Sequence, residues 1–398
     1  MGPLRTNRTF QLLWAGQAIS VLGSRASAVA YPLLVLSMTG SAALAGLVGF
    51  CGTVPYIVFQ LPAGTVADRA NRRRMMILCD TGRLLALGSI PLAGWLGRLT
   101  LPQIALVAFV EGSLFVFFRL GEVSAIRIVV APEQRAAALG QNEARLRAAT
   151  LLGSPIGGSL FGLGRTLPFL ADALSYAASL ATLLLIRVPF EEAREKGART
   201  HVLTEIREGM TWLWRQQYVL VVNLAASATN MLFQVVILVA IVAEVRRGAP
   251  ASLIGIVLGG FGLGGVAGAL CGGWLARRLR PNTIVLAAIW LWPAVTPFVA
   301  LTGQPVVLVL LLASLSFMGA AWNIAGDTLY LRLVPDRLIG RVSSVGSLTA
   351  FGALPLGSLV GGLLIQSFGP RPAGFMTAAA MVVVAVMTTL APAVRHGP

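Results

Sequence analysis

The sequence predicts an all-α membrane protein with twelve transmembrane helices in two pseudo-symmetric six-helix bundles. Three observations predict this fold class: a shortage of charge, a sided distribution of basic residues, and an internal repeat. Of the 398 residues, 56% are hydrophobic and 12% are charged. Soluble domains carry about 25% charged residues, so this chain lacks the polar surface that it would need in water.

Twelve apolar runs are long enough to cross a bilayer, because a span needs about 20 mostly apolar residues. We expect spans at roughly 10–38, 42–66, 75–97, 101–126, 143–164, 167–188, 217–244, 251–276, 282–302, 304–328, 342–366 and 371–393. The first run is too long for a cleavable signal peptide, so we count it as a span.

The basic residues predict the orientation of the chain. With the N-terminus inside, the inner segments hold 23 of the 31 Lys and Arg residues, the outer segments hold five, and three lie within spans. Basic residues gather on the cytoplasmic side of membrane proteins, so we expect both termini in the cytoplasm. The net charge of +16 is then explained by topology, with the lipid bilayer as partner and no nucleic acid.

A polar stretch divides the chain into two bundles, 1–188 and 217–398, joined by a cytoplasmic linker at 189–216. Apolar residues recur in this linker at helical spacing, which predicts an amphipathic helix along the inner membrane surface; they are Leu203, Ile206, Met210 and Leu213. The two bundles also share a sequence repeat: Pro155-Ile156-Gly157 matches Pro355-Leu356-Gly357 at an offset of 200. Such duplications are common in secondary transporters.

The loop after the second span carries a resemblance to a known family. It runs from Gly64 through Asp68 and Arg69 to Arg73 and Arg74, and it resembles the G-x-x-x-D-R-x-G-x-R-R signature of the major facilitator superfamily. Asn71 replaces the second glycine, and Asn tolerates a positive φ better than most residues. The resemblance implies that Asp68 helps to hold the two halves together at the cytoplasmic side. The alternative is a basic inner loop with an incidental aspartate.

The fifth span carries a second motif, Gly153-Ser154-Pro155-Ile156-Gly157-Gly158. It resembles the G-P-x-x-G-G motif of the antiporters in this superfamily, although ordinary helix packing through small residues explains it as well. The stretches 7–41, 169–176 and 205–215 are similar to bacterial exporters related to macrolide-efflux proteins and the enterobactin exporter. This branch implies drug:proton antiport in the bacterial inner (cell) membrane.

In this superfamily the substrate cavity is lined by spans one, four, seven and ten, and polar residues mark the same spans here. The predicted cavity residues are Gln17, Ser24, Tyr31, Phe115, Asn223, Ser227, Asn230, Gln234, Asn323 and Asp327. The four in span seven share one helical face. Phe118, Phe233 and Trp322 are further aromatic candidates, although aromatic residues also occur in ordinary packing.

Charged side chains in the middle of a span are costly and usually have partners. Glu111 lies near the middle of span four, where partial desolvation favours its protonated form, so we expect it to carry a proton. Arg25 is its expected partner, and Arg119 and Glu122 are expected to form a second pair; static salt bridges are the alternative for both. We expect Asp80 and Arg83 to form a structural pair, and Asp172 to be a packing or capping residue.

The sequence therefore predicts a monomeric secondary transporter that exports a small amphipathic compound in exchange for protons. A Walker A motif, a catalytic constellation and a metal-ligand pattern are all absent, so we expect no enzyme activity, no cofactor and no metal. An importer or facilitator with the same fold is the alternative, followed by a non-transporting membrane sensor.

Overall fold

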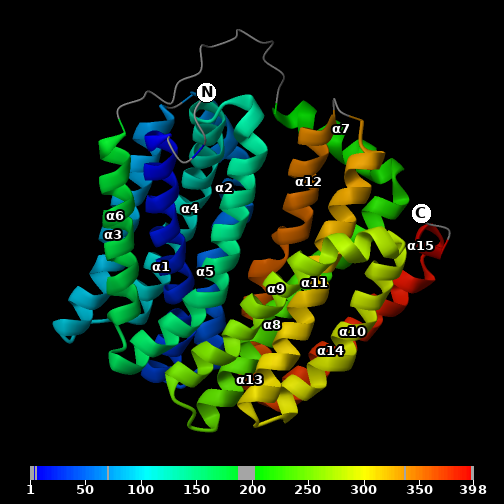
Figure 1. Ribbon diagram of the computed structural model, residues 1–398. Helices are drawn as coiled ribbons and strands as arrows, with labels where there is room; N and C mark the ends of the chain where they lie inside the picture. The colour runs from blue at the N-terminus through cyan, green and yellow to red at the C-terminus, as the bar shows by residue number, and fades with distance from the viewer. Residues whose placement is uncertain (1–3, 5–6, 70, 187–201, 336–337, 396–398) are drawn as a thin grey trace. The chain divides into compact units, whose positions relative to one another are not determined.

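The computed structural model describes residues 4, 7–69, 71–186, 202–335 and 338–395, without side chains for 61–69, 123, 124, 127, 136, 202–206, 331, 332, 339 and 340. The described residues form α-helices joined by short loops and 3-10 turns, and no strand occurs among them (Figure 1). They group into two compact units.

Unit 1 consists of Met1–Gly40, Cys51–Lys196 and Pro250–Ile256. Its helices are α1 (Arg8–Thr39), α2 (Ala42–Arg69) from Cys51 onward, α3 (Arg72–Trp95), α4 (Leu101–Val129), α5 (Arg135–Leu163) and α6 (Leu167–Leu185), with the 3-10 turn η2 (Pro132–Gln134) before α5. Helix α1 packs along α6 and α5, and α3 packs against α4 and α6.

Unit 2 consists of Ser41–Phe50, Gly197–Ala249 and Val257–Pro398. Its helices are α7 (Val202–Arg215), α8 (Gln217–Arg246), most of α9 (Ala251–Arg278), α10 (Pro281–Leu301), α11 (Pro305–Leu333), α12 (Ile339–Gly352), α13 (Leu354–Phe368), α14 (Pro370–Leu390) and α15 (Pro392–Arg395). Helix α8 packs along α13 and α14, and α10 packs against α11 and α14. The helix pairs of unit 1 therefore recur in unit 2, in the order that the sequence repeat predicts.

Eleven helical segments among the described residues are long and apolar enough to cross a membrane, and one of them, Arg341–Phe368, runs through both α12 and α13. Each begins and ends within a few residues of an expected span. Helix α5 is not one of the eleven, and its first half carries the charged side chains Arg135, Glu143, Arg145 and Arg147. The expected fifth span is thus a helix, but it is less apolar than the others.

The expected eleventh span is broken in its middle. Helix α12 ends at Gly352 and α13 begins at Leu354, with Pro355 in its first turn. A proline inside a helix removes one backbone hydrogen bond and collides with the carbonyl four residues earlier. The side chain of Asn230, on α8, donates to the backbone oxygen of Ala350 at 3.0 Å, which satisfies a carbonyl in the last turn of α12.

The linker helix exists, but its described apolar side packs against protein. Leu213 of α7 is buried in a cluster with Val219 and Val345, and the backbone of Gly209 lies against the backbone of Arg341 on α12. Glu208 forms an ion pair with Arg341. Leu213 is therefore covered by α8 and α12, whereas Met210 on the same predicted face is exposed; the position of α7 along the membrane surface stays a prediction.

Two glycine crossings show the internal repeat in three dimensions. In unit 1, Gly158 of α5 lies against Gly255 of α9, so closely that a β-carbon on either would collide with backbone atoms. In unit 2, Gly46 of α2 lies against Gly362 of α13 in the same way. Small residues allow this backbone contact between helices in lipid.

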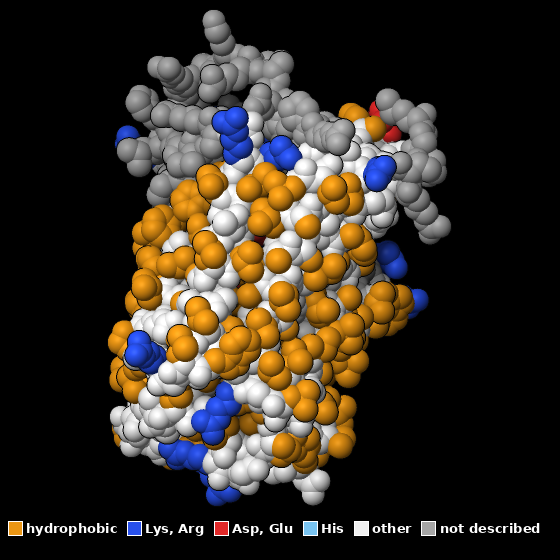
Figure 2. Space-filling model, turned by 90° about the vertical axis from the view of Figure 1, so that its left-hand side faces the viewer, with side chains coloured by type: hydrophobic (Ala, Val, Ile, Leu, Met, Phe, Trp, Pro, Cys, Tyr) orange, Lys and Arg blue, Asp and Glu red, His pale blue; other side chains and the backbone are white. Residues whose placement is uncertain are grey.

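Figure 2 shows one face of the protein on which hydrophobic side chains cover the middle and basic side chains lie towards the two ends. On α3 the strongly exposed leucines Leu78, Leu85 and Leu92 follow one another at seven-residue intervals, so they lie along one side of the helix. An apolar exterior of this kind fits contact with lipid.

Candidate functional site

The carboxyl group of Glu111 lies between two tyrosine hydroxyls. Tyr31 of α1 donates to Oε2 of Glu111 at 2.8 Å, and Tyr176 of α6 donates to Oε1 at 3.3 Å. Glu111 itself is half-buried on α4, whereas Tyr176 is fully buried. Three helices of unit 1 therefore meet at this carboxyl group.

Arg83 of α3 supplies the positive charge of this region. Its guanidinium lies 4.1 Å from the ring centroid of Tyr176, 5.4 Å from that of Phe115 and 5.7 Å from that of Phe118. Cations are attracted to the faces of aromatic rings, more strongly when desolvated. The predicted ion pair with Asp80 is present, with 3.6 Å between NH1 and Oδ1.

Arg25 does not have the predicted position beside Glu111. It is exposed, and its Cβ lies against Gly153 of α5. Successive residues in a helix are turned by about 100°, so Arg25 faces α5 while the neighbouring Ser24 faces α6. The predicted pair between Arg25 and Glu111 is therefore wrong.

The second predicted pair also has a different partner. Glu122 of α4 accepts from Arg145 of α5 at 2.7 Å, whereas Arg119 is exposed. The pair joins two helices rather than two turns of α4, because Arg145 reaches the same carboxylate from α5. Glu122 and Arg145 therefore form an interhelical contact.

Two of the predicted cavity residues of span one belong to buried hydrogen-bond networks. Gln17, which is 3% exposed, donates to the hydroxyl of Ser179 at 2.9 Å, and Ser179 donates to Oδ2 of Asp80 at 2.6 Å. Ser24 is 2.8 Å from the hydroxyl of Tyr176. Gln17 thus supports Asp80 and lies away from any open surface, while Ser24 adjoins the Glu111 site.

Asp172 of α6 is a fully buried carboxyl group that sequence reasoning undervalued. Ser27 of α1 donates to its Oδ2 at 2.5 Å, and Ser175 donates to its Oδ1 at 3.1 Å. A pattern in the sequence marks this face of α6, because Asp172, Ser175, Tyr176 and Ser179 recur at i, i+3, i+4 and i+7. The described residues contain no group of three His, Cys, Asp or Glu placed to hold a metal ion.

In unit 2 the four predicted cavity residues of span seven lie on α8, and two of them donate hydrogen bonds to backbone carbonyls. Asn223 donates to the carbonyl of Val219 within its own helix at 3.1 Å, and Asn230 donates to Ala350 at the break described above. Ser227 and Gln234 are half-buried. On α11, Asn323 and Asp327 are exposed.

The predicted aromatic residues have different surroundings in the two units. Phe115 packs against Tyr56, with 5.8 Å between ring centroids, and lies over Arg83. Trp322 is 5% exposed and packs on Trp292, which also contacts Phe233. The unit 2 rings are therefore core residues rather than an open pocket.

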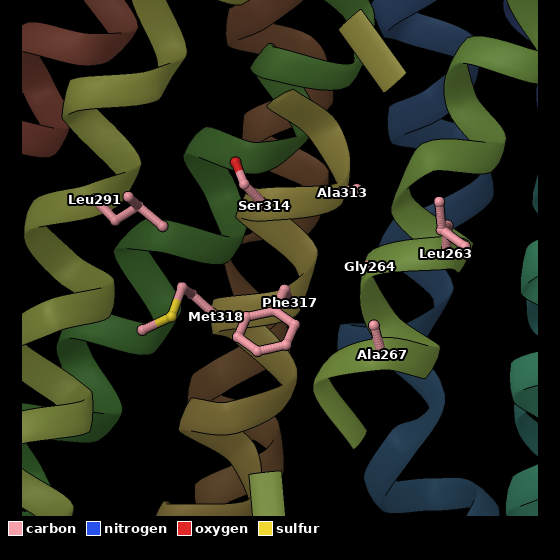
Figure 3. Close-up of a pocket in the computed structure, with 8 residues that line it drawn as sticks. All are labelled: Leu263, Gly264, Ala267, Leu291, Ala313, Ser314, Phe317 and Met318. Carbon is pink, nitrogen blue, oxygen red and sulfur yellow. The ribbon is translucent and has the colours of Figure 1, made fainter. Parts of the chain in front are cut away.

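A cavity of about 350 Å³ lies among α9, α10 and α11 of unit 2 (Figure 3). It is lined by Leu263, Gly264, Ala267, Leu291, Ala313, Ser314, Phe317 and Met318. Its hydroxyl group, on Ser314, donates to the carbonyl of Leu311 in the preceding turn at 2.7 Å. None of the predicted site residues lines this cavity, and it offers little chemistry for a polar ligand.

The predicted gate loop is described only in part. The side chains of Gly64, Asp68 and Arg69 lie outside the described residues. Arg73 donates to the carbonyls of Leu183 and Leu184 at the end of α6, at 3.2 and 3.1 Å. Basic side chains are favourable at a helix C-terminus, so Arg73 ties α3 to α6.

Asn71, the departure from the family signature, caps α3. Its φ is −64°, and its side chain accepts from the backbone nitrogen of Arg74 at 3.0 Å. Asn is among the preferred N-cap residues. The tolerance of Asn for a positive φ is therefore not used at this position, and a helix cap explains the residue.

The motif of the fifth span packs in two directions. Gly153 and Gly157 lie against α1, at Arg25 and Ala26, whereas Gly158 lies against α9. Pro155 is half-buried inside α5. The motif is thus a packing surface in this structure, and its bearing on the direction of transport stays a prediction.

Comparisons with known proteins agree with this architecture. The family model described as transmembrane secretion effector matches residues 1–396. The multidrug efflux pump Tap of Mycolicibacterium fortuitum is 27% identical over 387 residues, which cover 94% of this chain and 93% of that protein. Macrolide efflux protein A of Streptococcus pyogenes is 24% identical over 206 residues, or 51% of each chain.

Solved structures show the same fold at low sequence identity. The nucleoside transporter NupG aligns with a TM-score of 0.72 and 15% identity, covering 98% of this chain and all of its own. A bacterial homologue of the iron transporter ferroportin, in its inward-facing state, gives a TM-score of 0.72 and 17% identity over 98% of each chain.

Proposed function

Because the chain belongs to the transmembrane secretion effector family of the major facilitator superfamily, we propose that it exports a small amphipathic compound in exchange for protons. The names of its relatives, a multidrug efflux pump and a macrolide efflux protein, support export of drug-like molecules. The placement of Glu111 between two tyrosine hydroxyls is the observation that carries proton coupling.

Both protonation states of Glu111 have partners in this site. The ionised carboxylate accepts from Tyr31 and Tyr176 and faces the cation of Arg83 across the ring of Tyr176. The neutral carboxyl suits the low-polarity surroundings, where an ionised group is costly. A group that is stabilised in both states suits reversible binding of a proton during transport.

The proposed architecture is that of an alternating-access transporter with twelve transmembrane helices. Helix α5 supplies the twelfth span, and the bundles 1–188 and 217–398 are joined by the linker 189–216. The recurring helix pairs of the two units support this duplication. Asp68 is the proposed gate residue, the protein acts as a monomer, and both termini lie on the cytoplasmic side of a bacterial inner membrane.

We place the substrate near the polar side chains of α8 and α11 that are half-buried or exposed. Ser227 and Gln234 are half-buried on α8, and Asn323 and Asp327 are exposed on α11. Polar groups within a span usually face a water-filled path or another helix. In unit 1, Tyr31 and Phe115 border the Glu111 site and suit the apolar part of a substrate.

Transport by purified protein in liposomes, driven by an imposed pH gradient, tests the proposal. Erythromycin and ethidium serve as probes, because relatives are named for macrolide and multidrug efflux. We expect accumulation to rise with the gradient in the wild type. Each exchanged proton raises the ratio of substrate concentrations across the membrane by about tenfold per unit of the pH gradient. Glu111→Gln should therefore lower gradient-driven accumulation by about that factor.

Glu143→Gln is the matched control, because it makes the same change at a carboxylate that is 66% exposed and paired with Arg147 on one helix. If Glu111→Gln and Glu143→Gln export as well as the wild type, the coupling assignment is wrong. If the pH gradient drives uptake into the compartment that corresponds to the cytoplasm, the protein is an importer.

A further inference from the structure

Asp172 is a second carboxyl group in unit 1 that nothing above assigns to transport. We propose that it is a second proton-binding residue, so that the region around Arg83 binds two protons, one on Glu111 and one on Asp172. The inference rests on the proposed proton coupling and extends it to the number of protons carried.

The first observation is the balance of charge. Asp80, Glu111 and Asp172 all lie around Arg83, which is the one basic residue among the buried residues that the structure describes. One guanidinium neutralises one carboxylate. Isolated ionised carboxylates are very costly in an apolar interior, so the other two carboxyl groups need protons.

Hydrogen bonds identify Asp80 as the carboxylate that stays ionised. Gln17 donates to the hydroxyl of Ser179, which leaves the proton of Ser179 for Oδ2 of Asp80 at 2.6 Å. The guanidinium of Arg83 faces the other oxygen of Asp80 at 3.6 Å. Both partners of Asp80 present positive charge or a proton to it, as an ionised carboxylate requires.

The surroundings of Asp172 suit two protonation states. Each neighbouring hydroxyl has a choice of acceptor: Ser27 reaches Oδ2 of Asp172 at 2.5 Å or the carbonyl of Ser24 at 3.1 Å. Ser175 reaches Oδ1 at 3.1 Å or the backbone oxygen of Asp172 at 2.7 Å. A hydroxyl has a single proton, so these two groups satisfy either the carboxylate or the two backbone carbonyls.

The two states differ by one proton and two hydroxyl rotations. In the neutral state, the O–H of Asp172 donates to Ser27, while Ser27 and Ser175 donate to backbone carbonyls. On deprotonation the Oδ2–H bond breaks and the proton leaves for water. Ser27 then turns its hydroxyl to Oδ2 and Ser175 turns its hydroxyl to Oδ1, so no polar group is left unpaired.

At Glu111 the hydroxyl of Tyr176 has the same choice, whereas the hydroxyl of Tyr31 donates to Glu111 in either state. Ser24 is 2.9 Å from the carbonyl of Ser20 and 2.8 Å from the hydroxyl of Tyr176. Tyr176 therefore donates to Ser24 when Glu111 is protonated, and to Glu111 when it is ionised. Asp80 lacks this choice, because the one described acceptor of the Ser179 hydroxyl is Asp80 itself.

An independent observation concerns the hydrogen bonds of Arg83. Its Nε and the Oδ1 of Asp80 are both buried without a hydrogen bond among the described residues. Rings surround the rest of the guanidinium, so Nε remains available to an acceptor. A negative charge on Glu111 or on Asp172 interacts favourably with the same guanidinium, so we expect the protonation of one group to influence the other.

Titratable and charged groups on α1, α3 and α4 lie near Asp172 or its neighbours, whereas the described charged side chains of α5 do not. Tyr31 lies on α1, Asp80 and Arg83 lie on α3, and Glu111 lies on α4. On α5 the described charged side chains lie in the first half of the helix and pair elsewhere, Arg145 with Glu122 and Arg147 with Glu143.

Infrared spectroscopy of purified protein tests the proposal without any substrate. At about pH 8, ordinary carboxyl groups are ionised, so the C=O stretching band that remains reports buried protonated carboxyl groups. We expect two components in the wild type, loss of one in Asp172→Asn and loss of the other in Glu111→Gln. Glu143→Gln, which removes an exposed carboxylate paired with Arg147, is the matched control and should keep both components.

An unchanged band in Asp172→Asn overturns the proposal. Asn has the shape of neutral Asp and keeps a partner for each serine, so this variant should fold. If it does not, Ser27→Ala and Ser175→Ala each remove one hydrogen bond from the carboxyl group and should shift its band. A band that neither variant moves also overturns the proposal.

Transport gives the second reading. With two exchanged protons the accumulation of erythromycin changes by about a hundredfold per pH unit, and with one proton by about tenfold. We expect Asp172→Asn to show the smaller slope while exchange at equal pH persists, and an unchanged slope contradicts the inference. A wild type without any response to the gradient overturns the proposed function, whereas the infrared result still decides the state of Asp172.

Discussion

At the scale of the residue, Arg83 shows how a charge is kept inside a membrane protein. Three aromatic rings and one carboxylate surround its guanidinium, so attraction to ring faces replaces most of the water that it loses. Such a cation is strongly tied to its one ion-pair partner. Removing a single member of a buried pair leaves an uncompensated charge.

A double-mutant cycle on Arg83 and Asp80 tests this dependence. We expect Arg83→Met to destabilise the protein by about 3–5 kcal/mol, because Asp80 is left charged and unpaired. Adding Asp80→Asn should recover about 0.5–3 kcal/mol. Thermal unfolding in detergent measures both effects.

The exposed pair of Glu143 and Arg147 is the control for this cycle. Its partners are 66% and 39% exposed and lie one helical turn apart. Exposed pairs contribute about 0–1 kcal/mol, so Glu143→Gln with Arg147→Met should show almost no coupling. Additive effects at Asp80 and Arg83 would remove the argument that one depends on the other.

The sequence predicted the pair of Asp80 and Arg83 because both lie on one helix, three residues apart. It assigned Arg25 to Glu111 wrongly, because the partner of Glu111 depends on how α1 is rotated against α4 and α6. Helical periodicity states which residues share a face, but it does not state which helix that face meets. Packing between helices decides that question.

At the scale of the element, the bounds of the spans were predictable from hydropathy and flanking arginines. The break between α12 and α13 was not, because Pro355 alone does not say whether a helix bends or ends. The side chain of Asn230 makes an interrupted helix acceptable, since it bonds a carbonyl at the interruption. In lipid, such carbonyls need a partner from protein.

The glycines of α5 give a prediction at this scale. A β-carbon on Gly158 would collide with Ala251 and Gly255, whereas a β-carbon on Gly162 has no atom within 4 Å. We therefore expect Gly158→Ala to destabilise by about 1–3 kcal/mol through overpacking. Gly162→Ala, one turn later, should be neutral or stabilise by up to about 1 kcal/mol, because Ala favours the helix.

Thermal unfolding of the two variants in the same detergent decides the matter. Equal shifts in Tm for Gly158→Ala and Gly162→Ala would mean that the crossing with α9 has no part in stability. The contrast isolates the crossing, because the substitution and the helix are the same in both.

At the scale of the whole molecule, the arrangement of charge predicts the side on which each loop lies. The resemblance to a family was visible in the gate loop and the fifth span. The described structure adds that Asn71 caps α3 and that Gly158 packs on α9. Neither role follows from the motif, because the motif states residue types and not their neighbours.

Cysteine labelling in intact cells tests the orientation. We expect cysteines placed at Gly97 and Gly248 to react with a membrane-impermeant maleimide, because the distribution of basic residues predicts that these turns lie outside. Cysteines at Gln216 and Arg280 should react only after the membrane is permeabilised. The native residues Cys51, Cys79 and Cys271 are first replaced by alanine, and labelling of only Gln216 and Arg280 in intact cells would reverse the topology.

The break in the eleventh span has a mechanical consequence. Helix α12 and helix α7 are joined by the Glu208–Arg341 ion pair and by Leu213 packed on Val345, so we expect the two helices to move together. Asn230 holds the last turn of α12 to α8 through the carbonyl of Ala350, and the helix is interrupted at Ala353. We therefore expect a displacement of α7 to bend the chain at Ala353 rather than to be passed along α13.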